Sequence, residues 1–241
     1  MRLSDFDDWA RAHHGIITFE ASGLSRAAWY RAITAGTIEQ LHPHVARLYG
    51  TPDTPEQRII AAVEAVGAGC LASHRSAARL WGIPRPDHDP VDVLLPAQRR
   101  DLRLEGVVVH RPRDVAWLAP HHRFAIACTG IERTLLDLGA IDPQGLHDAV
   151  GHAIANGLVT LDALDAAATE HARPGRGGVV AVRDAIADWS IDDKPADSML
   201  EFTFDRLARR HGLPTLEFRP IVGGVTVDAR VRGTAVLLEC D

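Results

Sequence analysis

Acidic residues near the end of the sequence have the types and spacing of a metal-binding site. Asp228 falls late in one predicted strand, and Glu239 and Asp241 stand at the end of the next strand, two residues apart. Alternation along a strand places Glu239 and Asp241 on the same face. Carboxylates at the ends of adjacent strands can converge on one Mg²⁺, which prefers oxygen ligands and lowers the pKa of its bound water. Asp228 and Glu239 are therefore the expected metal ligands.

The surroundings of these acids favour a functional role. Val227 and Leu238 make the neighbourhood apolar, where a carboxylate is costly unless it is paired or metal-bound. Glu201, on the preceding predicted helix, could add a further carboxylate. Residues 198–201 also form a capping box, so helix stability alone could explain Glu201. The expected catalytic set is Glu201, Asp228, Glu239 and Asp241.

A second group of residues has the pattern of a helix that contacts DNA. Such a helix needs polar groups near its N-terminus that reach base edges, while neighbouring residues hold phosphates. Residues 24–50 contain three arginines and one glutamate, so this stretch is basic within an acidic chain. Ala27, Ala28 and Ile33 are expected to face inward. The expected DNA-binding residues are Ser25, Arg26, Tyr30 and Arg31 on one exposed helix face, with Arg47 contacting the DNA backbone.

The elements that must position these residues form three regions. Residues 1–50 predict a winged helix-turn-helix: helices at 4–12, 19–22 and 26–35, then strands at 38–41 and 45–49. Thr18 and Ser25 are the expected N-caps. Residues 54–190 predict a mixed α/β domain, with helices at 55–66, 76–81, 131–138, 144–156, 161–171 and 179–189, and strands at 91–95, 107–110 and 124–128.

The third region, residues 195–241, predicts a helix at 198–211 and strands at 218–222, 225–231 and 235–240. The sequence ends directly behind the last of these predicted strands. The overall fold class is therefore α+β or mixed. A capping box at Thr129–Glu132 is expected to begin the helix at 131–138.

Composition excludes several classes of protein. The chain has 241 residues, a net charge of −6 and 46% hydrophobic residues, which argues against disorder. No apolar run approaches the ~18–20 residues that cross a bilayer, and the polar N-terminus argues against a signal peptide. The three cysteines lie far apart, so neither a disulfide framework nor a zinc cluster is expected. We expect a cytoplasmic protein with no membrane contact.

Several stretches resemble known families. Residues 14–18, 23–26 and 48–50 resemble the N-terminal domain of AbiEi-type antitoxins, and residues 73–82, 90–93 and 129–138 are similar to the rest of that architecture. From Ser198 onward the chain resembles very-short-patch-repair-like endonucleases of PD-(D/E)XK type. In those families a lysine commonly follows the second acid, where this chain has Asp241, and the later His, Asp and Arg are missing. The resemblance therefore implies that residues 195–241 are the first part of an incomplete nuclease-like domain, and we expect the chain to be truncated there.

The antitoxin resemblance implies a transcriptional repressor that binds double-stranded DNA at its own promoter and counters a nucleotidyltransferase toxin in a type IV system. The nuclease resemblance implies Mg²⁺-dependent DNA cleavage with acids at Asp228 and Glu239. We expect a DNA-binding antitoxin-like regulator that needs no cofactor to bind DNA. The alternative is a DNA endonuclease guided by its winged helix, and a third class is a protein-docking adaptor, because winged helices also dock proteins.

Overall fold

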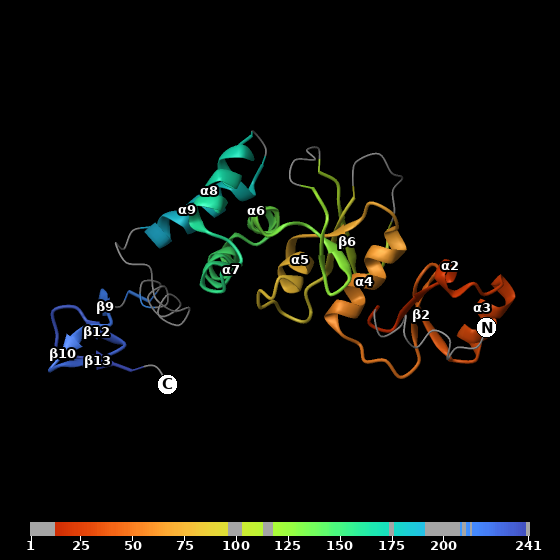
Figure 1. Cartoon of the computed structure of the whole chain (residues 1–241), viewed down its shortest axis with the longest axis horizontal. Helices are drawn as coiled ribbons and strands as arrows, with labels where there is room; N and C mark the ends of the chain where they lie inside the picture. Colours follow the sequence, from red (N-terminus) through yellow and green to blue (C-terminus); the bar gives the residue numbers. More distant parts are fainter. Residues whose placement is uncertain are drawn as a thin grey trace.

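The computed structural model describes residues 13–95, 103–112, 118–173, 176–190, 208, 211–212 and 214–239. These residues form a mixed α and β chain. The N-terminal module, the central sheet with its helices, and the last helices α6–α9 follow one another along the long axis (Figure 1). Among the described helices, none combines the length and apolar character needed to cross a bilayer.

The N-terminal module, residues 13–54, joins two helices to a three-stranded antiparallel sheet of order β1-β3-β2. Both expected N-caps are confirmed, because the Thr18 hydroxyl accepts from the Ala21 amide and the Ser25 hydroxyl from the Ala28 amide. The expected helix at 4–12 lies outside the described residues, and β1 is an additional strand. The elements are β1 (Ile16–Thr18), α2 (Phe19–Ser22), α3 (Arg26–Thr34), β2 (Ile38–His42) and β3 (Val45–Leu48).

Trp29 anchors α3 on this sheet. Its side chain is 2% exposed and packs with Ile17 and Ile38, while the Phe19 ring meets it edge-on. The expectation that Ala27 faces inward is wrong, because Ala27 is exposed. Trp29 defines the buried stripe with residues three and four positions later, and Ala27 lies about 200° around the helix from Trp29.

Helix α4 (Pro55–Val66) joins the N-terminal module to the central sheet. Ile16 and Val45 of the module belong to the same apolar cluster as Ile59 and Ile60 of α4. The core is thus continuous across the domain boundary expected at residues 50–54. The order and bounds of α4 confirm the predicted helix at 55–66.

The Gln57 side chain, on α4, is a polar joint between the two parts. Its residue is 1% exposed. Its Nε2 donates to the His14 carbonyl at 2.8 Å and to the Thr51 hydroxyl at 3.2 Å, and its Oε1 accepts from Arg47 at 3.4 Å. One amide thus connects α4 to three points of the N-terminal module.

The central sheet has five strands in the order β6-β5-β4-β8-β7. Strands β4 and β8 are parallel, as are β5 and β6, whereas β4–β5 and β7–β8 are antiparallel. The expected strand at 124–128 is corrected: Phe124 and Ala125 form the turn of a β7–β8 hairpin, with positive φ at both residues. The strands are β4 (Leu71–Ala72), β5 (Val91–Leu94), β6 (Val107–His110), β7 (His121–Arg123) and β8 (Ile126–Cys128).

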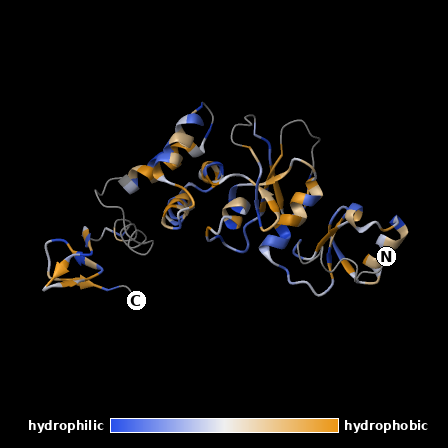
Figure 2. Ribbon diagram, in the orientation of Figure 1, coloured by the Kyte–Doolittle hydropathy of each residue, from blue (hydrophilic) through white to orange (hydrophobic). Residues whose placement is uncertain are grey.

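Five further helices complete this region, and all five contribute to a second apolar cluster around Leu135, Leu146 and Leu164. Figure 2 shows hydrophobic residues on the strands of the central sheet and on α7. Gly178 permits close packing of α9 on α6, because a Cβ there would lie 1.8 Å from the Leu136 carbonyl oxygen. The helices are α5 (His74–Leu80), α6 (Ile131–Ile141), α7 (Pro143–Ala155), α8 (Leu161–Glu170) and α9 (Gly178–Ser190).

The expected capping box at Thr129–Glu132 is wrong. The N-cap of α6 is Gly130, without a side-chain cap. Thr129 is fully buried, and its amide donates to the Ala72 carbonyl while its hydroxyl pairs with that of Thr134 at 2.7 Å. Thr129 therefore continues the pairing of β8 with β4, and it lies one residue before the N-cap of α6.

The C-terminal strands are shorter and more numerous than expected. They form a sheet of order β13-β12-β9 and a separate β10–β11 hairpin. Arg219 has a positive φ and Pro220 lacks an amide hydrogen, so the chain bends where one strand at 218–222 was expected. The expected helix at 198–211 lies almost wholly outside the described residues. The strands are β9 (Leu216–Phe218), β10 (Ile221–Val222), β11 (Val225–Thr226), β12 (Ala229–Val231) and β13 (Leu237–Leu238).

The Gln57 joint predicts a stability effect. We expect Gln57→Ala to lower the free energy of unfolding by about 1–3 kcal/mol, because it removes three hydrogen bonds at a buried position. Chemical denaturation followed by circular dichroism measures the change. Gln40→Ala, at an exposed position of β2, is the matched control and is expected to change stability by less than about 0.5 kcal/mol. Equal effects of the two variants would contradict the role of this joint.

Candidate nucleic-acid interface

Helix α3 has polar side chains on its exposed surface, whereas Trp29 is buried against the sheet. Arg26, Tyr30 and Arg31 are all exposed, and the Arg26 guanidinium lies 5.9 Å from the centre of the Tyr30 ring. The helix contains no acidic residue. Within the described part of the chain, neither arginine has a carboxylate partner. Three of the expected DNA-binding residues are thus exposed on α3. They give its surface two positive charges and an aromatic ring, with no carboxylate beside them in the described chain.

Ser25 has a positioning role at the start of this face. It is exposed, and its hydroxyl accepts from the Ala28 amide at 3.2 Å as the N-cap of α3. A capping serine sets the direction in which the helix begins. The hydroxyl is therefore engaged in the helix terminus, while the arginine one residue later projects from the first turn.

Arg47 is placed differently from the other expected DNA-binding residues. Its Nε donates to Glu39 at 2.8 Å, its Nη1 lies 3.7 Å from Asp53, and it also donates to Gln57. Its side chain is 21% exposed. Two carboxylates compensate its charge, so Arg47 stabilises the β2–β3 hairpin against α4, and a phosphate would have to compete with both acids.

Two of the C-terminal acids lie beside a pair of antiparallel strands, β12 and β13. The register pairs Ala229 of β12 with Leu238 of β13. Asp228 precedes Ala229 and Glu239 follows Leu238, so the two acids occupy the next pair of opposite positions. Asp228 is not late in a strand as expected; it precedes β12, because β11 ends at Thr226. It is half-buried, whereas Glu239 is exposed, so the expected apolar surroundings do not extend to Glu239.

The remaining members of the expected acidic set, Glu201 and Asp241, lie outside the described residues. Within the residues that the structure describes, no group of three or more His, Cys, Asp or Glu side chains could hold a metal ion. The pair of Asp228 and Glu239 therefore stands as two carboxylates at neighbouring positions, without a third ligand in the described chain.

A charged network in the central sheet was not found by sequence reasoning. Asp92 has no solvent exposure, and its carboxylate accepts from Arg75 at 2.6 and 3.1 Å and from His110 at 2.7 Å. Its amide donates to the Ser76 hydroxyl at 2.8 Å. The residues belong to β5, α5 and β6, so one carboxylate connects three elements. Buried acids are rarely unpaired, and Asp92 between apolar strand residues was the available signal.

The electrostatics of this network keep Asp92 ionised and His74 neutral. Burial acts to raise the pKa of Asp92, but hydrogen bonds from His110 and Arg75 outweigh it and hold the pKa below its usual value. His74 stacks on His110 with ring centres 3.7 Å apart. Burial, then the charge of His110, lowers the pKa of His74 to about 3, although Asp92 acts against this shift.

His74 also stands in a strained conformation. Its φ is 47°, which side chains with a Cβ rarely adopt, and its Nδ1 lies 2.9 Å from the Ser73 hydroxyl. The carboxylate of Asp92 orients the His110 imidazole, as an acid–histidine pair does in many sites. Both partners of Asp92 are side chains of the chain itself, so the arrangement holds α5 against the sheet.

The low pKa of His74 predicts a pH dependence of stability. Below pH 6.5 the unfolded chain binds a proton at His74 that the folded chain does not, so the free energy of unfolding falls as pH decreases from about 6.5 towards 3. Asparagine tolerates a positive φ, so His74→Asn keeps the backbone. We expect the stability of the wild type relative to this variant to fall by about 2 kcal/mol between pH 6.5 and 5.

Urea unfolding at a series of pH values measures this difference. The matched control is His122→Asn, at an exposed position of β7. Parallel pH profiles of the wild type and His74→Asn would contradict the assignment of a neutral buried imidazole.

Comparisons with known proteins do not identify a family or a function for the chain. No protein-family model matches the chain, and no curated protein matches its sequence. The functional conclusion therefore depends on the exposed face of α3 and on the residues that support it.

Proposed function

We propose that this protein binds double-stranded DNA through a winged helix-turn-helix formed by the N-terminal module, with α3 as the recognition helix. The order β1-α2-α3-β2-β3 and the sheet order β1-β3-β2 support this assignment. In such modules the recognition helix enters the major groove and its N-terminal residues contact base edges. The β2–β3 hairpin is then the wing beside it.

The observation that carries the proposal is the uncompensated charge on α3. Arg26 and Arg31 are exposed and have no carboxylate partner in the described chain, whereas Arg47, Arg75, Arg79 and Arg85 each pair with an aspartate or glutamate. Arginine binds phosphate oxygens and guanine edges through two parallel hydrogen bonds. Tyr30, between the two arginines, adds a hydroxyl donor on the same face.

The resemblance described for the sequence extends this proposal to a biological role. We infer a cytoplasmic antitoxin-like regulator that binds its own promoter and has a nucleotidyltransferase-type toxin as its partner. In that role DNA binding needs no cofactor, and the salt dependence of binding follows from the phosphate contacts.

The proposal predicts the effect of removing both arginines. We expect Arg26→Ala/Arg31→Ala to weaken binding roughly tenfold or more at fixed salt, and to reduce the slope of log K against log salt by about 2. Fluorescence anisotropy with a labelled duplex from the promoter region of the chain's own coding sequence, and with a scrambled duplex, measures both quantities. Arg183→Ala, on the exposed side of α9, is the matched control.

Circular dichroism confirms that the variants are folded, because neither arginine packs into the core. If the double variant had the affinity and the salt slope of the wild type, α3 would not be the recognition helix. A wild-type protein that retards no duplex at low salt would contradict DNA binding altogether and favour a protein-docking module.

A second candidate function rests on the register of the C-terminal strands. That register brings Asp228 and Glu239 to neighbouring positions, as an Mg²⁺-dependent endonuclease of PD-(D/E)XK type requires. The described residues supply these two carboxylates and no third ligand, so they do not form a complete site for the ion and no reaction step is derived from them.

Plasmid cleavage tests this alternative. If the chain is a nuclease, the wild type nicks supercoiled plasmid in Mg²⁺ and not in EDTA, and Asp228→Ala lowers the rate by at least 100-fold. Asp165→Ala, at an exposed position of α8, is the control and is expected to cleave like the wild type. Cleavage by Asp228→Ala at the wild-type rate would remove this site.

A further inference from the structure

The turn of the β7–β8 hairpin has a backbone that its residues disfavour. The register pairs Arg123 with Ile126, which leaves Phe124 and Ala125 as the two turn residues. Their φ angles are 51° and 64°. A two-residue turn with positive φ at both positions is a type I′ turn, for which Asn-Gly is the favoured sequence. A Cβ at such a position crowds the following carbonyl, and strain of this kind concentrates at functional positions.

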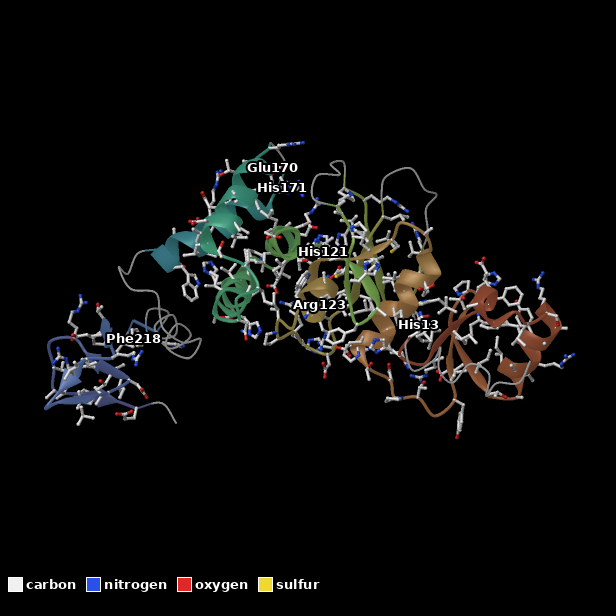
Figure 3. All side chains as sticks on the ribbon, viewed as in Figure 1. His13, His121, Arg123, Glu170, His171 and Phe218 are labelled. Carbon is white, nitrogen blue, oxygen red and sulfur yellow. The ribbon has the colours of Figure 1, made fainter. Side chains whose placement is uncertain are left out.

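The same turn presents an aromatic ring to solvent. Phe124 is 60% exposed at the tip of the hairpin. The Arg123 guanidinium lies 5.9 Å from the centre of the Phe124 ring and 5.0 Å from that of Trp81, and the His121 ring lies 5.8 Å from Trp81. We call Trp81, His121, Arg123 and Phe124 the hairpin patch. Figure 3 labels His121 and Arg123 in the central part of the chain.

The hairpin patch is cationic without a compensating acid. Residues 121–128, which form the hairpin, contain no Asp or Glu. In the described chain, Arg123 has no carboxylate partner; its Nε donates to the Leu80 carbonyl at 3.4 Å. A guanidinium that contacts aromatic rings is restricted in direction and keeps its charge available. These properties are complementary to a phosphate backbone and not to a basic or neutral protein surface.

A hydrogen bond connects this hairpin to the N-terminal module. The Nε2 of His14 lies 3.1 Å from the Phe124 carbonyl oxygen. His14 stands two residues before β1, and β1 pairs with β3 in the sheet that supports α3. The tip of the hairpin therefore contacts the module to which DNA binding is assigned.

We propose that the β7–β8 hairpin is a second DNA contact, in which Phe124 enters the minor groove as an apolar wedge and Arg123 binds a neighbouring phosphate. Apolar side chains inserted between base steps bend the duplex and bring more protein surface onto it. The inference rests on the DNA binding proposed for α3. It adds a contact in the minor groove, made by the β7–β8 hairpin, and a bend in the DNA.

The turn itself supplies a test that does not depend on damaging the fold. Phe124→Asn/Ala125→Gly introduces the favoured type I′ sequence, so we expect the melting temperature to rise by a few degrees. The same double variant is expected to weaken binding to the promoter duplex about tenfold. It is also expected to abolish the bend, measured as energy transfer between dyes at the two ends of the duplex.

Arg123→Ala is expected to lower the salt slope of binding by about 1, the loss of a single phosphate contact. The matched control is Val180→Ser, which changes an apolar side chain that is 64% exposed on α9, and it is expected to leave affinity, slope and bend unchanged.

The outcomes separate this inference from the one on which it rests. If Arg26→Ala/Arg31→Ala weakens binding while the hairpin variants bind and bend DNA like the wild type, the hairpin contact is overturned and the assignment of α3 stands. If the wild type binds no duplex, both are overturned. A more stable hairpin variant with lower affinity and no bend supports the proposal.

Discussion

The carboxylate of Asp92, sealed from solvent, is the constraint on which the central part of the chain depends. Arg75 from α5 donates to both of its oxygens and His110 from β6 to one of them, and removal of Arg75 would leave the buried charge without its arginine partner. The position of α5 is thereby fixed on the sheet. The end of α5 leads directly to Trp81, so the same ion network determines where the Arg123 guanidinium lies above that ring.

A second polar group performs a comparable task near the start of α4. The Gln57 amide holds the N-terminal module at His14 and Thr51 and also accepts from Arg47. Arg47 is therefore part of the support of α3 and not part of its exposed face. Two buried polar groups, one charged and one neutral, position the two cationic surfaces of the molecule, and apolar packing alone would leave their mutual orientation less well defined.

The parts of the structure that could be predicted from the sequence are those decided locally. The helices α2, α3 and α4 begin at Thr18, Ser25 and Thr54 because short side chains cap the first turn within three residues. The Asp92–His110 pair could not be found in this way, since 18 residues separate its members and a parallel strand pair brings them together.

Two other departures have distinct physical reasons. Phe124 and Ala125 have the composition of a strand and not of a type I′ turn, so local propensity favours the wrong structure there. Ala27 was placed inward by its apolar character, but the larger Trp29 determines which side of α3 is buried. Of the candidate site, the exposure of Ser25, Arg26, Tyr30 and Arg31 followed from helical periodicity, whereas the ion pairs of Arg47 depend on tertiary contacts with Asp53 and Gln57.

Among the described strands, β7 lies at one edge of the five-stranded sheet, a position at which another chain could extend the sheet. If two copies paired there in an antiparallel ladder centred on His122, Arg123 of each would lie opposite His121 of the other, beside the ring of Phe124. Such an arrangement gathers cations and bulky side chains at a contact that favours flat, uncharged strands. The side chains of the hairpin patch thus also protect the sheet from edge-to-edge aggregation.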